Sequence, residues 1–225
     1  TAWPFPMVEI PKIYPILDTG VLKSRGIDPL AAATELLDAG AGILQLRHKG
    51  EYTRDVLDMA VQIADACRVA AIPFVINDRA DIAHMIPGAW LHLGQDDLSI
   101  TDAQLVTGPD APVGVSTHNE RQLLDACATP ASYLAIGPIS ATTSKENPDP
   151  VVGVDELALM RETADWVLAG LPLVAVGGIT VDNAQSVWKA GAASVAVISG
   201  LIPAQYQPGS IGERFSEWLA ASVLS

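Results

Sequence analysis

Short apolar runs alternate with helical patterns along nearly the whole chain, and this alternation constrains the fold more than any other feature. Each run is bounded by Gly, Pro or polar residues, which is typical of buried strands. The expected strands cover residues 13–18, 43–46, 74–76, 91–93, 112–116, 133–137, 173–176 and 194–198. The repeat of strand and helix predicts an α/β protein.

The segments between these runs carry the signals of helices. Asp28 followed by Pro29 is typical of an N-cap residue and a first helical residue. Thr101 with Gln104 matches a capping box. The expected helices cover residues 29–39, 53–70, 81–86, 101–106, 120–128, 155–168, 182–190 and 212–223.

Strands that alternate with helices imply a parallel sheet, because each crossover returns the chain to the same end. Eight such units in 225 residues predict a single closed (β/α)8 TIM barrel over residues 13–225, after an N-terminal extension at 1–12. An open doubly wound sheet is the structural alternative. The expected first strand is not followed by Gly-x-Gly-x-x-Gly, and this absence disfavours a dinucleotide-binding fold.

The charge and the apolar content of the chain exclude several classes of partner. A formal net charge of −13 argues against a general nucleic-acid surface. No segment approaches the ~18 to 20 apolar residues that span a bilayer, and residues 1–11 do not match a signal peptide. Two distant cysteines, Cys67 and Cys127, are typical of reduced thiols. We therefore expect a cytoplasmic protein without nucleic-acid or membrane partners, and a homo-oligomer is compatible with these features.

Polar residues follow seven of the expected strands. Barrel enzymes build their sites at this end, where the strands terminate. No comparable polar series precedes the strands, so the pattern predicts one active site on this face. The residues are Arg47, Lys49, Asn77, Asp78, Gln95, Asp96, Asp97, Ser116, Thr117, His118, Thr142, Thr143, Ser144, Lys145, Gly177, Gly178, Ser199 and Gly200.

The charges in this series suit a phosphorylated small molecule and a metal ion. Asp78 and Asp97 follow successive strands, and two carboxylates brought together repel each other unless a cation lies between them. Mg²⁺ prefers such oxygen ligands and bridges pyrophosphate groups. Arg47, Lys49 and Lys145 supply cationic donors for phosphate oxygens. The glycines after the last two expected strands fit a second, metal-free phosphate site.

Structural roles remain open for some of these residues. Asp78 and Asp97 also fit as caps of the helices that follow them. Arg47 and Lys49 also fit a solvated edge. His92 fits a satisfied core histidine nearly as well as a substrate contact, and His118 is equally open.

Several ordered motifs resemble the thiamine-phosphate synthase family over about residues 13–201. They are Gln45-Leu46-Arg47-His48-Lys49, Ile76-Asn77-Asp78-Arg79, His92-Leu93-Gly94-Gln95-Asp96-Asp97, Gly114-Val115-Ser116, Gly137-Pro138 with Thr142 to Lys145, Val176-Gly177-Gly178-Ile179 and Val197-Ile198-Ser199. Each motif alone is weak, whereas the ordered set is specific. The resemblance implies a transferase on a (β/α)8 barrel. It would join 4-amino-2-methyl-5-hydroxymethylpyrimidine diphosphate to 4-methyl-5-(2-hydroxyethyl)thiazole phosphate, with release of pyrophosphate.

The resemblance also implies a role for each matching residue. Asp78 and Asp97 would be Mg²⁺ ligands. The diphosphate would be held by Arg47, Lys49, Asn77 and Lys145. Gln45 and His92 would lie near the pyrimidine, and Ser116 near the leaving pyrophosphate or the pyrimidine amino group. The thiazole phosphate would contact Thr142, Ser144, Gly178, Ile198 and Ser199.

The chain departs from the family pattern at Ser144, where the family usually has Thr, and at Trp90, which stands at the entrance of the expected fourth strand. Two alternative functions share the barrel. A thiazole tautomerase needs no diphosphate or metal groups, and His118 alone favours it. A non-catalytic phosphate-ligand-binding barrel has no reason to keep two carboxylates beside three cations.

Overall fold

The computed structural model describes residues 8–141 and 149–223, which form a closed barrel of parallel strands. Within these residues each strand pairs with the next along the chain, and the last pairs with the first. The predicted (β/α)8 barrel is therefore confirmed, and the open sheet is excluded. The strands are β1 (Ile13–Asp18), β2 (Leu44–Arg47), β3 (Phe74–Asn77), β4 (Trp90–Leu93), β5 (Val113–Thr117), β6 (Tyr133–Ile136), β7 (Leu173–Val176) and β8 (Ser194–Val197).

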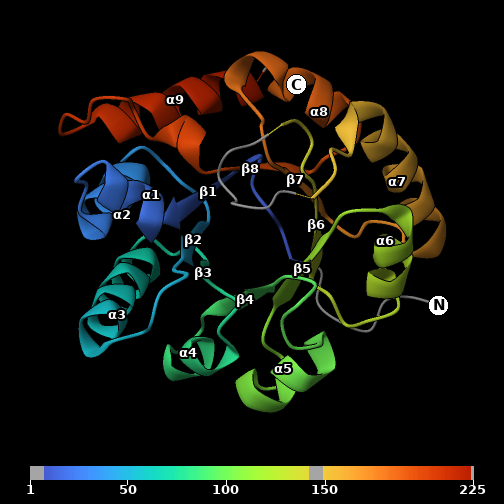
Figure 1. The fold of residues 1–225 in the computed structure, drawn as a ribbon, viewed down its shortest axis with the longest axis horizontal. Helices are drawn as coiled ribbons and strands as arrows, with labels where there is room; N and C mark the ends of the chain where they lie inside the picture. Colours follow the sequence, from blue (N-terminus) through green and yellow to red (C-terminus); the bar gives the residue numbers. More distant parts are fainter. Residues whose placement is uncertain (1–7, 142–148, 224–225) are drawn as a thin grey trace.

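The helices form a ring around the strands (Figure 1). Their order around the ring follows their order in the chain, so the last helix returns to the side of the first. They are α1 (Thr19–Ser24), α2 (Pro29–Asp38), α3 (Arg54–Val69), α4 (Ala80–Met85), α5 (Ile100–Thr107), α6 (Glu120–Cys127), α7 (Gly153–Val167), α8 (Val181–Lys189) and α9 (Ser210–Ser222), with a 3-10 turn η1 (Ser199–Leu201). None of the described helices is long and apolar enough to cross a membrane.

Of the two expected helix caps, one is confirmed and the other is wrong. Asp28 caps α2, and its carboxylate accepts from the Ala31 N–H at 2.9 Å. The capping box expected at Thr101 is wrong. Helix α5 begins earlier, and Ser99 is its N-cap, with its hydroxyl accepting from the Asp102 N–H at 3.1 Å.

The sequence patterns missed the short helix α1 and the turn η1. The carboxylate of Asp18 begins α1 by accepting from the Val21 N–H at 3.0 Å. Each element is too short to show a helical period.

Alternation along the strands creates two separate cores. Successive side chains of a strand point to opposite faces. One set packs against the helices and forms the larger core. The other set points into the barrel and includes Tyr14, Ile16, Ile43, Val75, Tyr133, Ala135, Val174 and Ala196.

The described end of the N-terminal extension packs against the interior core. Val8 and Ile10 contact this core before β1 begins, and Trp90 joins it from the start of β4. Trp90 is thus a packing residue at the strand entrance. The opposite end of the barrel, where the strands terminate, carries the polar residues.

Candidate active site

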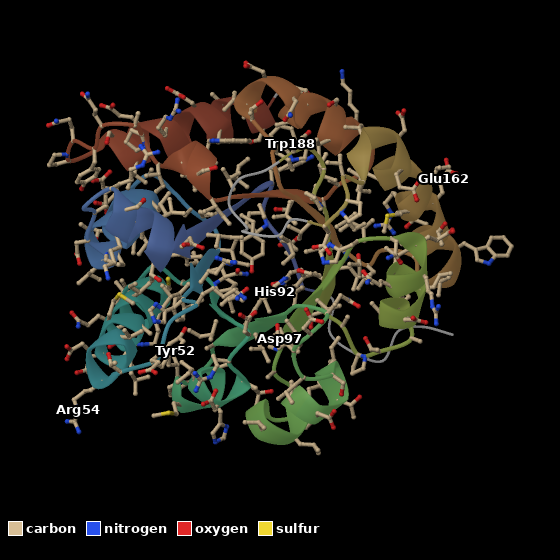
Figure 2. All side chains as sticks on the ribbon, in the orientation of Figure 1. Tyr52, Arg54, His92, Asp97, Glu162 and Trp188 are labelled. Atoms are coloured by element: carbon tan, nitrogen blue, oxygen red, sulfur yellow. The ribbon has the colours of Figure 1, made fainter. Side chains whose placement is uncertain are left out.

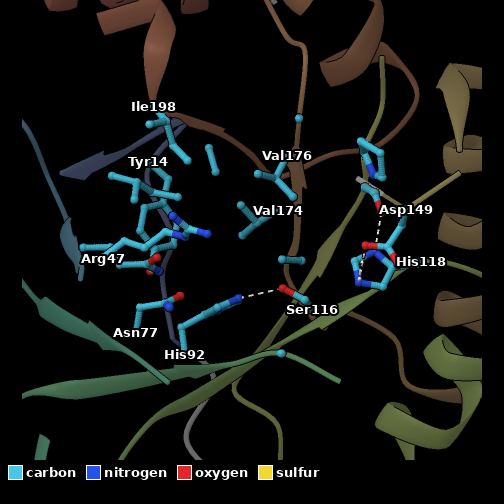
Figure 3. A pocket seen from close by; sticks show the side chains of 18 of the residues that line it. Tyr14, Arg47, Asn77, His92, Ser116, His118, Asp149, Val174, Val176 and Ile198 are labelled. Carbon is cyan, nitrogen blue, oxygen red and sulfur yellow. Dashed lines mark hydrogen bonds and ion pairs between the residues drawn. The ribbon is translucent and has the colours of Figure 1, made fainter. Parts of the chain in front are cut away.

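A pocket of about 510 Å³ opens at the C-terminal ends of the strands, and every strand contributes at least one residue to it. Figure 2 shows His92 within the ring of helices, whereas Arg54 and Glu162 lie at its outer edge. Figure 3 shows the pocket side chains converging from opposite strands. The structure brings together these sequence-predicted residues: Gln45, Arg47, Lys49, Asn77, Asp78, His92, Asp97, Ser116, Gly178, Ile198 and Ser199.

Two carboxyl groups and an ammonium group meet at the ends of β2, β3 and β4. Lys49 Nζ lies 2.5 Å from Asp78 Oδ2. Burial raises the pKa of Asp97. The N–H of Gly94, which donates to Asp97 Oδ2 at 2.7 Å, opposes this rise, and the neighbouring Asp78 carboxyl adds to it. The Asp78 contribution shows that the two carboxyl groups lie close enough to disfavour charge on both.

Neither acid caps a helix, so the capping interpretation of both is wrong. Helix α4 has Arg79 at its N-cap position and no side-chain cap bond, and α5 is capped by Ser99. Asp78 instead has a φ of 66°, a left-handed backbone that few residues other than Gly adopt. Such strain is concentrated at functional sites. With this left-handed backbone, Asp78 lines the pocket.

Next to the acids lie a half-buried cation, Arg47, and a buried amide, Asn77. Arg47 forms an ion pair with Asp18, an acid that the sequence did not assign to the site. The solvated-edge interpretation therefore does not hold for Arg47. Asn77 is 6% exposed, and its Nδ2 atom has no hydrogen-bond partner among the described residues. A buried donor without a partner is unfavourable by about 1 to 3 kcal/mol, which points to a ligand that would accept from it.

Tyrosine hydroxyls form the polar floor of the pocket, and the sequence patterns missed both of them. Gln45 Nε2 donates to the Tyr14 hydroxyl at 2.9 Å, and this hydroxyl lies 2.8 Å from that of Tyr133. His92 contacts Tyr133 through Nδ1 and Ser116 through Nε2. His92 is thus both a satisfied buried histidine and a pocket residue. The alternating side-chain direction within β1 and β6 was the only signal that would have placed these tyrosines inside the barrel.

Residues that follow β7 and β8 also line the pocket, and at one of them another backbone segment lies very close. Gly178 has a φ of 65°, and a Cβ atom there would lie 2.5 Å from the Ala141 carbonyl oxygen. Only Gly fits this crowded, left-handed position. Ile198 and Ser199 line the same part of the pocket.

His118 is held at the pocket wall. Its Nδ1 lies 2.5 Å from the Gly137 carbonyl oxygen, and its Nε2 lies 3.3 Å from Asp149 Oδ2. The sequence left this residue open, and the structure ties its ring to backbone and carboxylate.

The donor set fits Mg²⁺ held jointly with a substrate. Among the described residues, no three His, Cys, Asp or Glu side chains form a cluster that could hold a metal alone. Mg²⁺ usually keeps several waters and is bound through one or two carboxylates plus substrate phosphates. Asp78 and Asp97 supply two such carboxylates at one pocket. Thr142, Ser144 and Lys145, the other sequence-predicted site residues, lie outside the described residues.

Comparison with known proteins agrees with this geometry. The family model described as "Thiamine monophosphate synthase" matches residues 13–201. The chain is 44% identical over 200 residues to a thiamine-phosphate synthase of Koribacter versatilis, covering 87% of this chain and 90% of the relative. It is 34% identical over 219 residues to a thiamine-phosphate synthase of Bacillus velezensis, covering 96% and 94%.

A solved structure supports the same assignment. The thiamine phosphate pyrophosphorylase of Pyrococcus furiosus superposes with a TM-score of 0.80 at 27% identity, covering 95% of this chain and 97% of that one. Since the family model and these relatives each span most of the sequence, the chain belongs to the thiamine monophosphate synthase family.

Proposed function

We propose that this chain is a thiamine-phosphate synthase. It joins 4-amino-2-methyl-5-hydroxymethylpyrimidine diphosphate to 4-methyl-5-(2-hydroxyethyl)thiazole phosphate and releases thiamine phosphate and pyrophosphate. The observation that carries the proposal is the meeting of Lys49, Asp78 and Asp97 beside Asn77 Nδ2, a donor without a partner among the described residues. That group of charges and donors suits a diphosphate bound with a metal.

Asp78 and Asp97 would hold the Mg²⁺ ion. When bound, the metal neutralises negative charge on the diphosphate and thereby improves the leaving group. Lys49 would then transfer its ion pair from Asp78 to a phosphate oxygen. Arg47, already oriented by Asp18, would hold the diphosphate on another side, together with Asn77.

The substitution would be dissociative. The amino group of the pyrimidine delocalises positive charge at the methylene carbon, so the C–O bond breaks before the thiazole nitrogen attacks. Such a reaction needs a stabilised leaving group and a well-placed acceptor, and it needs no enzyme nucleophile. The pocket fits this need, because Val174, Val176 and Ile198 add apolar side chains beside its polar groups.

The thiazole phosphate would bind at the ends of β7 and β8. Gly178, Ile198 and Ser199 would contact it there, and Thr142 and Ser144 would complete the set. Lys145 would assist the diphosphate, and Ser116 would contact the leaving pyrophosphate. Gln45 and His92 would lie against the pyrimidine ring.

The remaining parts of the proposal concern the whole chain. Residues 13–225 would act as one catalytic unit, with residues 1–12 as an extension. We place the protein in the cytoplasm, where Cys67 and Cys127, both buried and free in the structure, stay reduced. Its partners would be the two small-molecule substrates, without nucleic acid or membrane.

The test is to mix both substrates with the purified protein and Mg²⁺ and to measure thiamine phosphate. We expect product with Mg²⁺ and little after chelation of the metal. A folded protein that makes no product would refute the proposal. A tautomerase would instead rearrange a thiazole phosphate without using the pyrimidine diphosphate, and the same assay distinguishes this outcome.

A further inference from the structure

A continuous chain of hydrogen bonds crosses the interior of the barrel from β2 to β5. Gln45 Nε2 lies 2.9 Å from the Tyr14 oxygen, which lies 2.8 Å from the Tyr133 oxygen. His92 Nδ1 lies 3.0 Å from the Tyr133 oxygen, and His92 Nε2 lies 2.9 Å from Ser116 Oγ. The last link is the dashed line between His92 and Ser116 in Figure 3.

Only one direction gives every hydroxyl proton of this chain an acceptor within the chain. The amide nitrogen of Gln45 can only donate, so the Tyr14 oxygen accepts from it. In that direction Tyr14 gives its one proton to Tyr133, because the reverse would leave the Tyr14 proton without an acceptor in this chain. Tyr133 then accepts from Tyr14 and has one proton left, which goes to His92 Nδ1. An imidazole that accepts at Nδ1 carries its own proton on Nε2.

The same reasoning determines the role of Ser116. If His92 carries its proton on Nε2, it donates to Ser116 Oγ. The Ser116 oxygen then accepts a hydrogen bond from His92, and the hydroxyl keeps its own proton to donate to another partner. Ser116 is half-buried and lines the pocket, so this proton is available to a bound molecule.

We propose that Tyr14 and Tyr133 are positioning residues that hold His92 as the neutral Nε2–H tautomer and thereby make Ser116 a hydrogen-bond donor toward the pocket. The inference rests on the proposed function for one point, that the acceptor is an oxygen of the departing pyrophosphate. A donor aimed at an oxygen that gains negative charge stabilises bond breaking more than substrate binding.

Burial keeps both phenols in the state that this role requires. It raises the pKa of Tyr14 and raises that of Tyr133 still more clearly above the ordinary value. Both phenols therefore keep their protons at neutral pH. Each can accept one hydrogen bond while it donates another. The Tyr133 ring also stacks on His92, with centroids 5.6 Å apart and planes 24° apart, which fixes the plane of the imidazole.

A glycine makes this arrangement sterically possible. Gly114 is paired in register with Tyr133, and a Cβ atom on Gly114 would lie 2.1 Å from Tyr133 Cζ. No other residue leaves room for the ring at this position. The Tyr133 hydroxyl is directed to His92 by the room that Gly114 leaves, by the stacking of the two rings and by the hydrogen bonds.

The first test reads the tautomer directly in the intact, substrate-free protein. The chain has four histidines, so ¹⁵N-histidine NMR gives few signals, and a His92→Gln variant identifies the one required. We expect the shifts of a neutral imidazole protonated at Nε2. A neutral Nδ1–H form, or an imidazolium at neutral pH, would overturn the proposal without bearing on whether the protein is a synthase.

The second test separates positioning from packing. Tyr133→Phe keeps the ring and removes the hydroxyl, and we expect kcat to fall about tenfold, the scale typical of lost outer-shell partners, with KM for both substrates within about twofold of the wild-type value. Tyr52→Phe is the matched control, because its buried hydroxyl has no partner in the part of the chain that the structure describes, and its kcat should be unchanged. An unchanged kcat in folded Tyr133→Phe would refute the role of Tyr133. A wild-type protein without any synthase activity would refute the proposed function instead.

Discussion

Lys49 and Asp78 form an ion pair across the ends of β2 and β3, with Nζ and Oδ2 2.5 Å apart. The lysine side chain is 55% exposed, whereas that of Asp78 is 17% exposed. The carboxylate is therefore the more enclosed partner, and the ammonium group lies closer to solvent. If Asp78 holds the proposed Mg²⁺, Lys49 would pair with a phosphate oxygen of the bound substrate instead.

Replacing Asp78 should separate metal binding from folding. Asn tolerates the left-handed backbone at this position, so Asp78→Asn should keep the fold. We expect Mg²⁺-dependent turnover to fall by about two orders of magnitude or more, because a charged ligand is lost. Turnover across a Mg²⁺ titration, with thermal unfolding measured in parallel, checks this. Asp81→Asn, at a surface acid paired with Arg79, serves as the control.

Asn77 should matter for activity and little for stability. Its Nδ2 atom is unpaired, so Asn77→Ala removes no hydrogen bond that this donor makes to the described residues. We expect KM for the pyrimidine diphosphate to rise roughly 10- to 100-fold, as for the loss of a hydrogen bond to a charged group.

Asn119, in contrast to Asn77, should matter for stability and not for substrate binding. It caps α6, and its side chain accepts from the Gln122 N–H at 3.0 Å. Asn119→Ala should lower the free energy of unfolding by about 1 kcal/mol and leave KM unchanged. Equal effects of the two asparagine variants on stability and on KM would contradict the assignment of Asn77.

Glu35 should make the stability of the chain depend on pH. Burial alone would raise the pKa of this carboxyl, but the N–H of Gly209, the hydroxyl of Tyr206 and the N–H of Ile211 together hold it below its ordinary value. These contacts tie α2 to the start of α9. Since the pKa is lowered on folding, the stabilisation is present above the unfolded-state pKa and is lost as pH falls through the folded-state value.

The Glu35→Gln variant tests this dependence. Its unfolding temperature should lie below that of the wild type near neutral pH, and the difference should shrink as pH falls below the unfolded-state pKa and vanish below the folded-state pKa. Glu162→Gln, at an exposed position on α7, should show no difference at either pH. A constant difference across the whole range would exclude the charge of Glu35 as the cause.

The contact between Gly114 and Tyr133 should appear as strong coupling between the two positions. Gly114→Ala forces the ring to move, and we expect a loss of about 1 to 3 kcal/mol in the free energy of unfolding. The same change in a Tyr133→Ala background should be much less unfavourable, because the ring is gone. Denaturant unfolding of the four proteins of this double-mutant cycle measures the coupling, and additive effects would contradict it.

Local patterns were sufficient to predict the strands and the end of the barrel that carries the site. Polar residues follow seven of the expected strands within the chain itself, so Asn77, Asp78 and Asp97 could be recognised without knowing any neighbour. Parallel strands then bring their carboxyl ends to one edge. The family resemblance added the expected roles.

Contacts between residues that lie far apart in the sequence could not be predicted from such local patterns. Tyr14 and Tyr133 contact each other across 119 positions of the chain, and each looks like an ordinary strand aromatic in its own segment. Asp18 becomes part of the site only because β2 places Arg47 beside it. The left-handed backbone of Asp78 is likewise invisible in a residue type that also fits a helix cap.

The alternation of strand side chains between the two cores limits how this family can change in length. Removing one residue from β3 would turn Asn77 toward the helices and Ile76 into the pocket, since a shift of one position exchanges the two faces. Insertions and deletions that preserve activity must therefore fall in the loops. The loops at the N-terminal ends of the strands, far from the pocket, are where we expect chains of different length to diverge.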